Sequence, residues 1–204
     1  MSGMSTSHLQ SPSPTSTPTR ELEDTQLDDS QPPTTSDVKY GFKIYRTDYS
    51  DESKWERFMT YLNAQVQARM KEENIAHEIL NIDWAIETSP DIACASEEDI
   101  RRRFIAWVDS DDEPTDNSAR FRACIVVDHD CLIDVNAVVE LLEEADEELD
   151  EFDDDGLAWV RLVSRDPSEG SLRVCVSYLL PRTFNFVPYN WEQIGADGKD
   201  PARP

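Results

Sequence analysis

The sequence predicts an α+β domain, in which helices pack against a mainly antiparallel sheet. Short apolar runs with the spacing of strands alternate with longer segments whose apolar residues recur every three or four positions. Turn-forming residues separate these segments, and the last two strand-like runs follow each other without a helix between them. The expected order is β-α-β-α-β-α-β-β within residues 38–192, and a ferredoxin-like arrangement is the nearest familiar type.

The domain begins with a strand that leads directly into the most strongly patterned helix of the chain. Phe42 and Ile44 alternate with Lys43 and Tyr45, as in a strand covered on one face. Ser50 has the position of an N-cap, because two acidic residues follow it in the first turn. The apolar residues of the helix fall on one stripe: Trp55, Phe58, Met59, Leu62 and Val66.

A second strand and a second helix follow. Residues 79–86 end in alternating apolar residues and predict the strand. Ser96 precedes three acidic residues and predicts the start of the helix. The three arginines of this helix, at 101–103, lie beside its apolar stripe and are expected to project largely outward and to neutralise neighbouring acidic residues.

The second half of the domain contains a central strand, a third helix and a hairpin. The apolar run at 121–127 indicates a strand covered on both faces. Asp130 or Asp134 is expected to cap the helix that follows. The runs at 158–163 and 172–179 flank a turn with proline and glycine, which is typical of a hairpin.

The composition limits the kinds of partner and compartment. Acidic residues outnumber lysine and arginine by 43 to 19, giving a net charge of −24, so the surface repels nucleic acid and anionic membranes. No apolar segment is long enough to span a bilayer or to serve as a signal peptide. The cysteines form no C-x-x-C pair and are expected to be buried free thiols: Cys94, Cys124, Cys131 and Cys175. We therefore expect a cytoplasmic or nuclear protein.

Both ends of the chain differ in composition from the domain. Residues 1–37 are rich in serine, threonine, proline and acidic residues, and such segments bury too little apolar surface to order themselves. We expect this tail to be disordered and residues 193–204 to be loose.

The first candidate site is the acidic run from Glu140 to Asp155, which contains no basic residue. Repulsion between like charges is expected to fray the third helix into an acidic loop that ends at Gly156. This surface could bind a basic protein partner, or it could simply keep the protein soluble. The residues expected to bind the partner are Glu147, Glu148, Asp150, Asp153, Asp154 and Asp155.

The second candidate site is a pocket between the sheet and the helices. Four aromatic residues could line it, with Arg46 or His129 as the polar group: Tyr45, Trp55, Trp84 and Trp107. The alternative interpretation is that the aromatic residues form the core. The histidine lies in a run of four potential ligands, Asp128 to Cys131, but the chain offers few further ligands, so we expect no metal and no cofactor.

One sequence pattern resembles a known group of proteins. The run Tyr40-Gly41-Phe42-x-Ile44-Tyr45-Arg46-Thr47, then Trp55 and Phe58, then Arg101-Arg102-Arg103-Phe104 with Trp107, resembles a group of uncharacterised fungal proteins. The resemblance implies a fungal, intracellular origin and transfers no site residues. Two functions are compatible with the sequence: a non-catalytic interaction module, and a small enzyme or ligand-binding protein. The protein could also form a homodimer.

Overall fold

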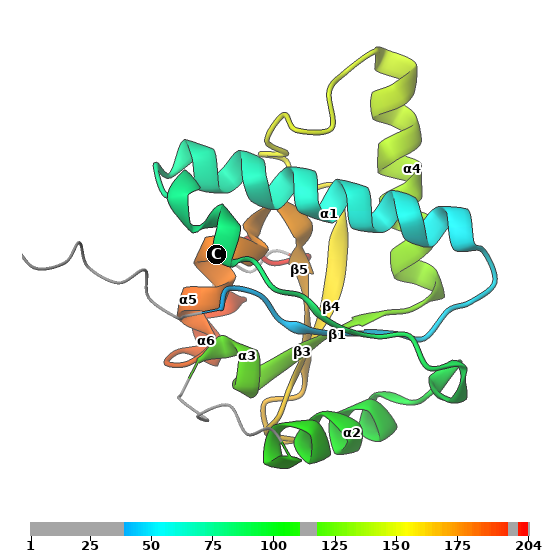
Figure 1. Cartoon of the computed structure of the whole chain (residues 1–204), viewed down its shortest axis with the longest axis vertical. Helices are drawn as coiled ribbons and strands as arrows, with labels where there is room; N and C mark the ends of the chain where they lie inside the picture. The colour runs from blue at the N-terminus through cyan, green and yellow to red at the C-terminus, as the bar shows by residue number, and fades with distance from the viewer. Residues whose placement is uncertain (1–38, 111–117, 196–199, 204) are drawn as a thin grey trace, which may run out of the picture. The chain divides into compact units, whose positions relative to one another are not determined.

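Five strands form one mixed sheet in the order β2-β1-β3-β4-β5 (Figure 1). The computed structural model describes residues 39–110, 118–195 and 200–203. The strands are β1 Lys43–Arg46, β2 Ala85–Glu87, β3 Ala123–Val127, β4 Trp159–Ser164 and β5 Ser171–Cys175. β1 pairs in parallel with β2 and β3, whereas β3–β4 and β4–β5 are antiparallel.

The helices separate the first four strands. They are α1 Glu52–Glu72, α2 Glu97–Ser110, α3 Ala119–Arg122, α4 His129–Ala145, α5 Phe184–Phe186 and α6 Trp191–Ile194. Shorter helical turns occupy Ala76–Asn81, Pro90–Ile92, Val176–Tyr178 and Leu179–Thr183. None of the helices in the described part of the chain has the length and apolar character needed to cross a membrane.

The α+β class and the order of the main elements are confirmed, but half of the strand pairings are parallel. Because α1 and α2 return the chain to the starting end of the sheet, β2 and β3 both run parallel to β1. β2 lies on one side of β1 and β3 lies on the other, so the crossovers through α1 and α2 run in opposite directions along the sheet. α1 and α2 therefore cover opposite faces (Figure 1). The ferredoxin-like arrangement is not confirmed.

Two apolar layers cover the sheet. On the α1 and α4 side, the stripe of α1 packs against Phe42, which precedes β1, and against alternate residues of β1 and β3, including Ile44 and Ile125. On the α2 side, Phe104 packs against Tyr45 and other residues that point the opposite way. β1 is therefore buried on both faces, where the sequence had predicted one, because α2 crosses behind it.

Several local expectations were wrong by a few residues. The N-cap of α1 is Asp51, whose carboxylate accepts from the amides of Ser53 at 3.0 Å and Lys54 at 3.4 Å. The predicted strand at 79–86 begins as a helical turn and contributes only the short edge strand β2. The predicted strand at 121–127 likewise begins as α3, and β3 starts at Ala123.

Arg101 does not project outward. It is only 5% exposed, and its Nε donates to the carbonyl of Ser164 on β4 at 3.0 Å. Its terminal nitrogens pair with Glu98 and Glu97 at 2.7 and 2.8 Å, as the charge-neutralising interpretation expected. Burial is tolerated because all three nitrogens have partners.

The described residues of the C-terminal segment contact the domain. Trp191 is buried, and α6 continues to Ile194, beyond the predicted domain end at 192. Ala202 pairs in parallel with Val174 and exchanges backbone hydrogen bonds with Arg173 and Cys175 at 2.8 and 3.0 Å. Residues 200–203 thus extend the edge at β5, whereas residues 1–37 and 196–199 lie outside the described part.

Candidate functional site

The carboxyl edge of the parallel strands is where an α/β sheet most often binds ligands. The chain leaves β1 towards β2 and leaves β3 towards β4, so the connections diverge between these two strands. Arg46 ends β1 and His129 begins α4, which brings both predicted polar groups to this edge. The arrangement of their hydrogen bonds decides whether either group can receive a ligand.

Arg46 holds the turn between β1 and α1. Its guanidinium carbon lies 4.7 Å from the ring centre of Tyr49 and 5.0 Å from that of Trp55. Its Nε donates to the carbonyl of Asp48 at 2.8 Å, and Nη1 pairs with Glu52 at 2.8 Å. With a side chain only 4% exposed, Arg46 is an internal salt-bridge partner. A ligand could reach it only after the turn had rearranged.

His129, at the start of α4, contacts the turn between β1 and α1 from the solvent side. Its Nδ1 lies 2.8 Å from Asp48 Oδ2, and Asp48 also accepts from the amide of Ser50 at 2.8 Å. Burial opposes ionisation of Asp48, but the Ser50 amide and the His129 ring outweigh it, so the pKa of this carboxyl lies below its usual range. The imidazole remains largely exposed and is oriented by Asp48.

The helix N-termini at this edge carry their own carboxylates. Asp51 caps α1, and Asp128 caps α4 by accepting from the amide of Cys131 at 3.0 Å. The cap of α4 is therefore Asp128, and neither of the two predicted residues: Asp130 is exposed, and Asp134 accepts from the indole of Trp159 at 2.6 Å. These carboxylates occupy the amides that would otherwise attract an anion.

The cysteine in this run is a core residue. Cys131 is fully buried, its sulfur lies 3.3 Å from the carbonyl oxygen of Trp159, and burial raises the pKa of its thiol well above the usual value. Within residues 39–110, 118–195 and 200–203, no group of three histidine, cysteine or carboxylate side chains is arranged to hold a metal ion.

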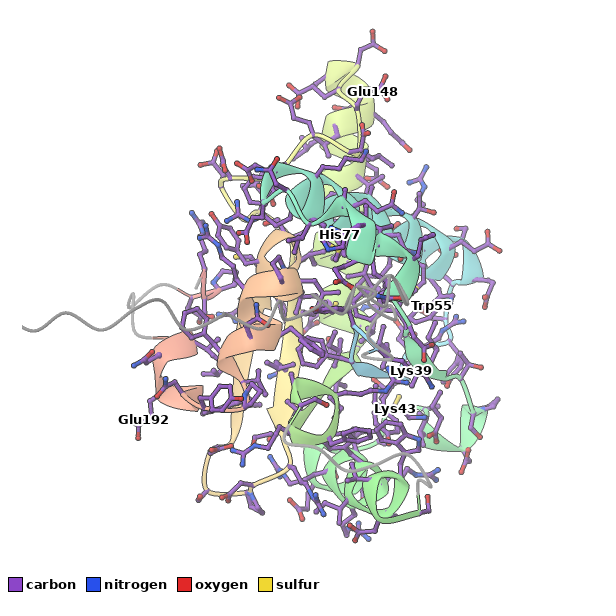
Figure 2. The ribbon with its side chains drawn as sticks, turned by 60° about the vertical axis from the view of Figure 1, so that its left-hand side comes forward. Lys39, Lys43, Trp55, His77, Glu148 and Glu192 are labelled. Atoms are coloured by element: carbon purple, nitrogen blue, oxygen red, sulfur yellow. The ribbon has the colours of Figure 1, made fainter. Side chains whose placement is uncertain are left out.

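The four aromatic residues of the predicted pocket belong to different layers. Trp55 and Trp84 pack on the α1 side of the sheet, and Tyr45 and Trp107 pack on the α2 side. Lys43, which Figure 2 labels together with Trp55, places its ammonium group 5.3 Å from the ring centre of Tyr45 and 5.2 Å from that of Trp107. The sheet divides the four residues, so they do not line one cavity. Their positions support the alternative interpretation, in which they form the core.

The acidic segment after α4 has a defined backbone. The helix continues to Ala145 and does not fray at Glu140 as expected. Asp146 adopts φ 58°, and the amides of Asp146 and Glu147 bond back to the carbonyls of Glu143 and Leu142 at 3.3 and 2.9 Å. This is the hydrogen-bond pattern of a Schellman motif, with aspartate in the left-handed position that glycine usually takes. Figure 1 shows the end of α4 extending past α1 and away from the sheet.

Gln65 fixes the loop at 146–156 to α1. Its amide nitrogen donates to the carbonyls of Leu149 at 3.0 Å and Glu151 at 2.7 Å. Its Oε1 accepts from the amide of Asp153 at 2.9 Å. Gln65 is 1% exposed, so a single buried side chain satisfies three backbone groups of the loop.

Asp153 is an anchor rather than a surface charge. Its Oδ2 accepts from the amide of Leu157 at 2.7 Å and from the hydroxyl of Tyr61 at 3.3 Å, and its carbonyl accepts from Ser177 at 2.8 Å. The other predicted partner-binding residues are exposed: Glu147, Glu148, Asp150, Asp154 and Asp155. Figure 2 shows Glu148 at the outer end of this part of the molecule.

A groove lies between α1, α4 and this loop, which we call the acidic groove. Its apolar wall consists of Tyr61, Val138, Leu142, Phe152 and Leu157. Its rim consists of Glu147, Glu151, Asp153, Asp154 and Asp155, with Gln65 as the other polar residue. The volume is about 240 Å³, below the roughly 300–1,000 Å³ of small-molecule pockets.

Phe152 is held in the groove wall by stacking. The guanidinium of Arg69 lies 4.6 Å from the centre of the Phe152 ring, and the Tyr178 ring meets Phe152 edge-on with centroids 5.6 Å apart. Sequence reasoning missed Gln65, Tyr61 and Arg69. Their one available signal was the presence of polar atoms next to the apolar stripe of α1.

Comparison of the chain with protein-family models, with curated proteins and with solved structures found no match. The geometry of the site therefore carries the functional argument.

Proposed function

We propose that this protein is a non-catalytic interaction module that binds a basic protein partner through the acidic projection, defined as residues 140–155. The observation that carries the proposal is a fixed backbone that presents unpaired negative charge. Gln65 and Asp153 hold the loop against α1, whereas no side-chain hydrogen bond or ion pair joins the exposed carboxylates of Glu147, Glu148 and Asp155 to a described residue. A preformed surface of this kind loses little conformational freedom when a partner binds.

The negative charges at the C-terminus of α4 do not stabilise this helix. A helix C-terminus carries partial negative charge and is stabilised by lysine or arginine in its last turn, yet α4 has glutamates there and no basic residue. Arg57 lies 3.5 Å from Glu140 and 3.4 Å from Glu143, and Lys71 lies 3.8 Å from Asp150. These exposed contacts are weak.

A basic partner would supply the missing cations. It would lie against both the helix terminus and the carboxylates of the loop, and the attraction would accelerate association at low salt. The carboxyl edge of the sheet offers less support for the enzyme alternative. Arg46 already donates to Glu52 and to the carbonyl of Asp48, and the carboxylates of Asp48 and Asp128 already accept from backbone amides.

The experiment compares two variants of equal net charge. The test variant is Glu147→Gln/Glu148→Gln/Asp155→Asn, and the control variant is Glu56→Gln/Asp130→Asn/Glu192→Gln; all six residues are exposed. Binding of a fluorescently labelled lysine-rich peptide is measured by anisotropy at about 0.05 M and 0.5 M salt.

We expect the test variant to bind about tenfold more weakly at low salt, since each exposed charge pair contributes about 0.2–1 kcal/mol. The control variant should change affinity by less than about twofold. Binding should also weaken at high salt, where the Debye length is short. If both variants lose affinity equally, the peptide responds only to net charge and the proposal is wrong.

A further inference from the structure

We infer that the segment of the partner that docks here is a basic stretch with one apolar side chain, and that this side chain inserts into the acidic groove. The inference rests on the proposed function and adds the chemistry of the recognised segment. Three observations carry it: the apolar wall of the groove, its size and its charge.

The wall offers apolar contact that the fold itself does not use fully. Val138 and Leu142 pack against the core from α4, whereas Leu157 is 56% exposed at the mouth of the groove. A surface lysine alone would leave this area in contact with water. A leucine or a similar side chain would cover it, and burial of apolar area favours binding.

The volume of the groove suits a single amino-acid side chain better than a small molecule. About 240 Å³ is too small for most cofactors and drug-sized ligands, which occupy roughly 300–1,000 Å³. A single residue of a peptide fits this space. Short linear segments are commonly recognised by one or two such anchors together with complementary charge.

The charge around the groove requires basic residues on either side of the anchor. Five of the residues that line the groove are acidic and none is basic. The anchor therefore enters a strongly negative opening, and lysine or arginine next to it would offset that potential. A neutral or acidic apolar segment would lack this compensation.

The same charge argument excludes two occupants from within the protein. Residues 1–37 contain six acidic residues and one arginine, so the N-terminal tail is repelled by the rim. A second copy of the chain carries the same net charge of −24, so it lacks the positive charge that the rim of the groove favours. A basic segment of another protein remains as the occupant.

The experiment uses two labelled peptides of about twelve residues with identical lysine content. One carries leucine at its centre and the other carries serine there. We expect the leucine peptide to bind the full-length protein roughly tenfold more tightly, because a leucine that is only partly buried realises part of its transfer free energy.

Two matched variants locate the contact. Leu157→Ser removes an apolar residue from the mouth of the groove, and Leu141→Ser removes a residue that is 61% exposed on α4 but does not line the groove. Leu157→Ser should abolish most of the difference between the two peptides, whereas Leu141→Ser should preserve it.

The outcomes separate this inference from the proposed function. If both peptides bind the wild-type protein equally and with strong salt dependence, the apolar anchor is refuted while the acidic docking surface stands. If Leu141→Ser acts as strongly as Leu157→Ser, the apolar contact lies outside the groove and the inference is overturned. If neither peptide binds, both proposals fail.

Discussion

Replacement of Asp153 should destabilise the domain, although the residue lies in the middle of an acidic loop. In Asp153→Ala, the amide of Leu157 and the hydroxyl of Tyr61 lose their common acceptor, which lies at 2.7 and 3.3 Å. Tyr61 is fully buried, so its hydroxyl has no access to water unless the loop opens. The change therefore tests whether the loop is anchored as the structure shows.

The expected loss is about 2 kcal/mol. Hydrogen bonds to a charged acceptor contribute about 1.5–3 kcal/mol, and an unpaired buried hydroxyl costs about 1–3 kcal/mol. Relief of repulsion within the loop offsets part of this cost. For a domain of this size, the melting temperature should fall by about 4–8 °C.

Thermal melting and urea unfolding followed by circular dichroism give the measurement. Asp153→Asn keeps one side-chain acceptor and should recover part of the loss. Asp154→Asn removes an exposed charge next to it and should change stability by less than about 0.5 kcal/mol. Equal melting temperatures for Asp153→Ala and Asp154→Asn would refute the assignment of Asp153 as an anchor.

Three further predictions concern the backbone, the pH dependence and the thiols. Gly156→Ala should lower the free energy of unfolding, measured in urea, several times more than Gly170→Ala. Both glycines have positive φ, so both substitutions strain the backbone. In addition, a Cβ at Gly156 would lie 2.5 Å from the sulfur of Cys175, whereas one at Gly170 would meet no described atom within 4 Å. The lowered pKa of Asp48 means that its carboxylate stabilises the fold above about pH 4, the unfolded value, and that this contribution disappears as the pH falls through the folded value. The stability difference between wild type and Asp48→Asn should therefore shrink between pH 6 and pH 3, and a constant difference would contradict the assignment. The expectation of buried thiols was wrong for Cys94, which is exposed, whereas Cys124, Cys131 and Cys175 are buried. A thiol reagent should therefore modify one site in the native protein and none in Cys94→Ser.

The parts of the fold that the sequence predicted correctly depend on local patterns. The stripe of α1 is visible because Phe58, Leu62 and Val66 must share one helix face to be buried. Ser96 was predicted to start α2, and its hydroxyl does accept from the amide of Asp99 at 3.2 Å. Such signals involve residues within one or two turns of each other.

The parts that could not be predicted depend on contacts between distant segments. Gln65 looks like a polar residue on a helix until the loop more than 80 positions later returns to it. Arg101 looks exposed until the carbonyl of Ser164 meets it from β4. The parallel pairing of β1 and β3 also depends on distant segments, because the end of the sheet at which the chain enters β3 is set by how the preceding helices pack.

The two ends of α4 explain why the candidate function lies away from the carboxyl edge of the sheet. At its N-terminus, Asp128 bonds to the backbone and lies 3.4 Å from Arg161, so the helix dipole and its carboxylate are mutually satisfied. At its C-terminus, the partial negative charge of the helix dipole lies next to glutamate side chains. Gln65 holds the following loop in this position. This charge arrangement opposes the stability of its own helix, and such local conflicts are typical of functional sites. The basic partner would therefore stabilise α4 on binding, and protection of its last turn from hydrogen exchange should increase in the complex.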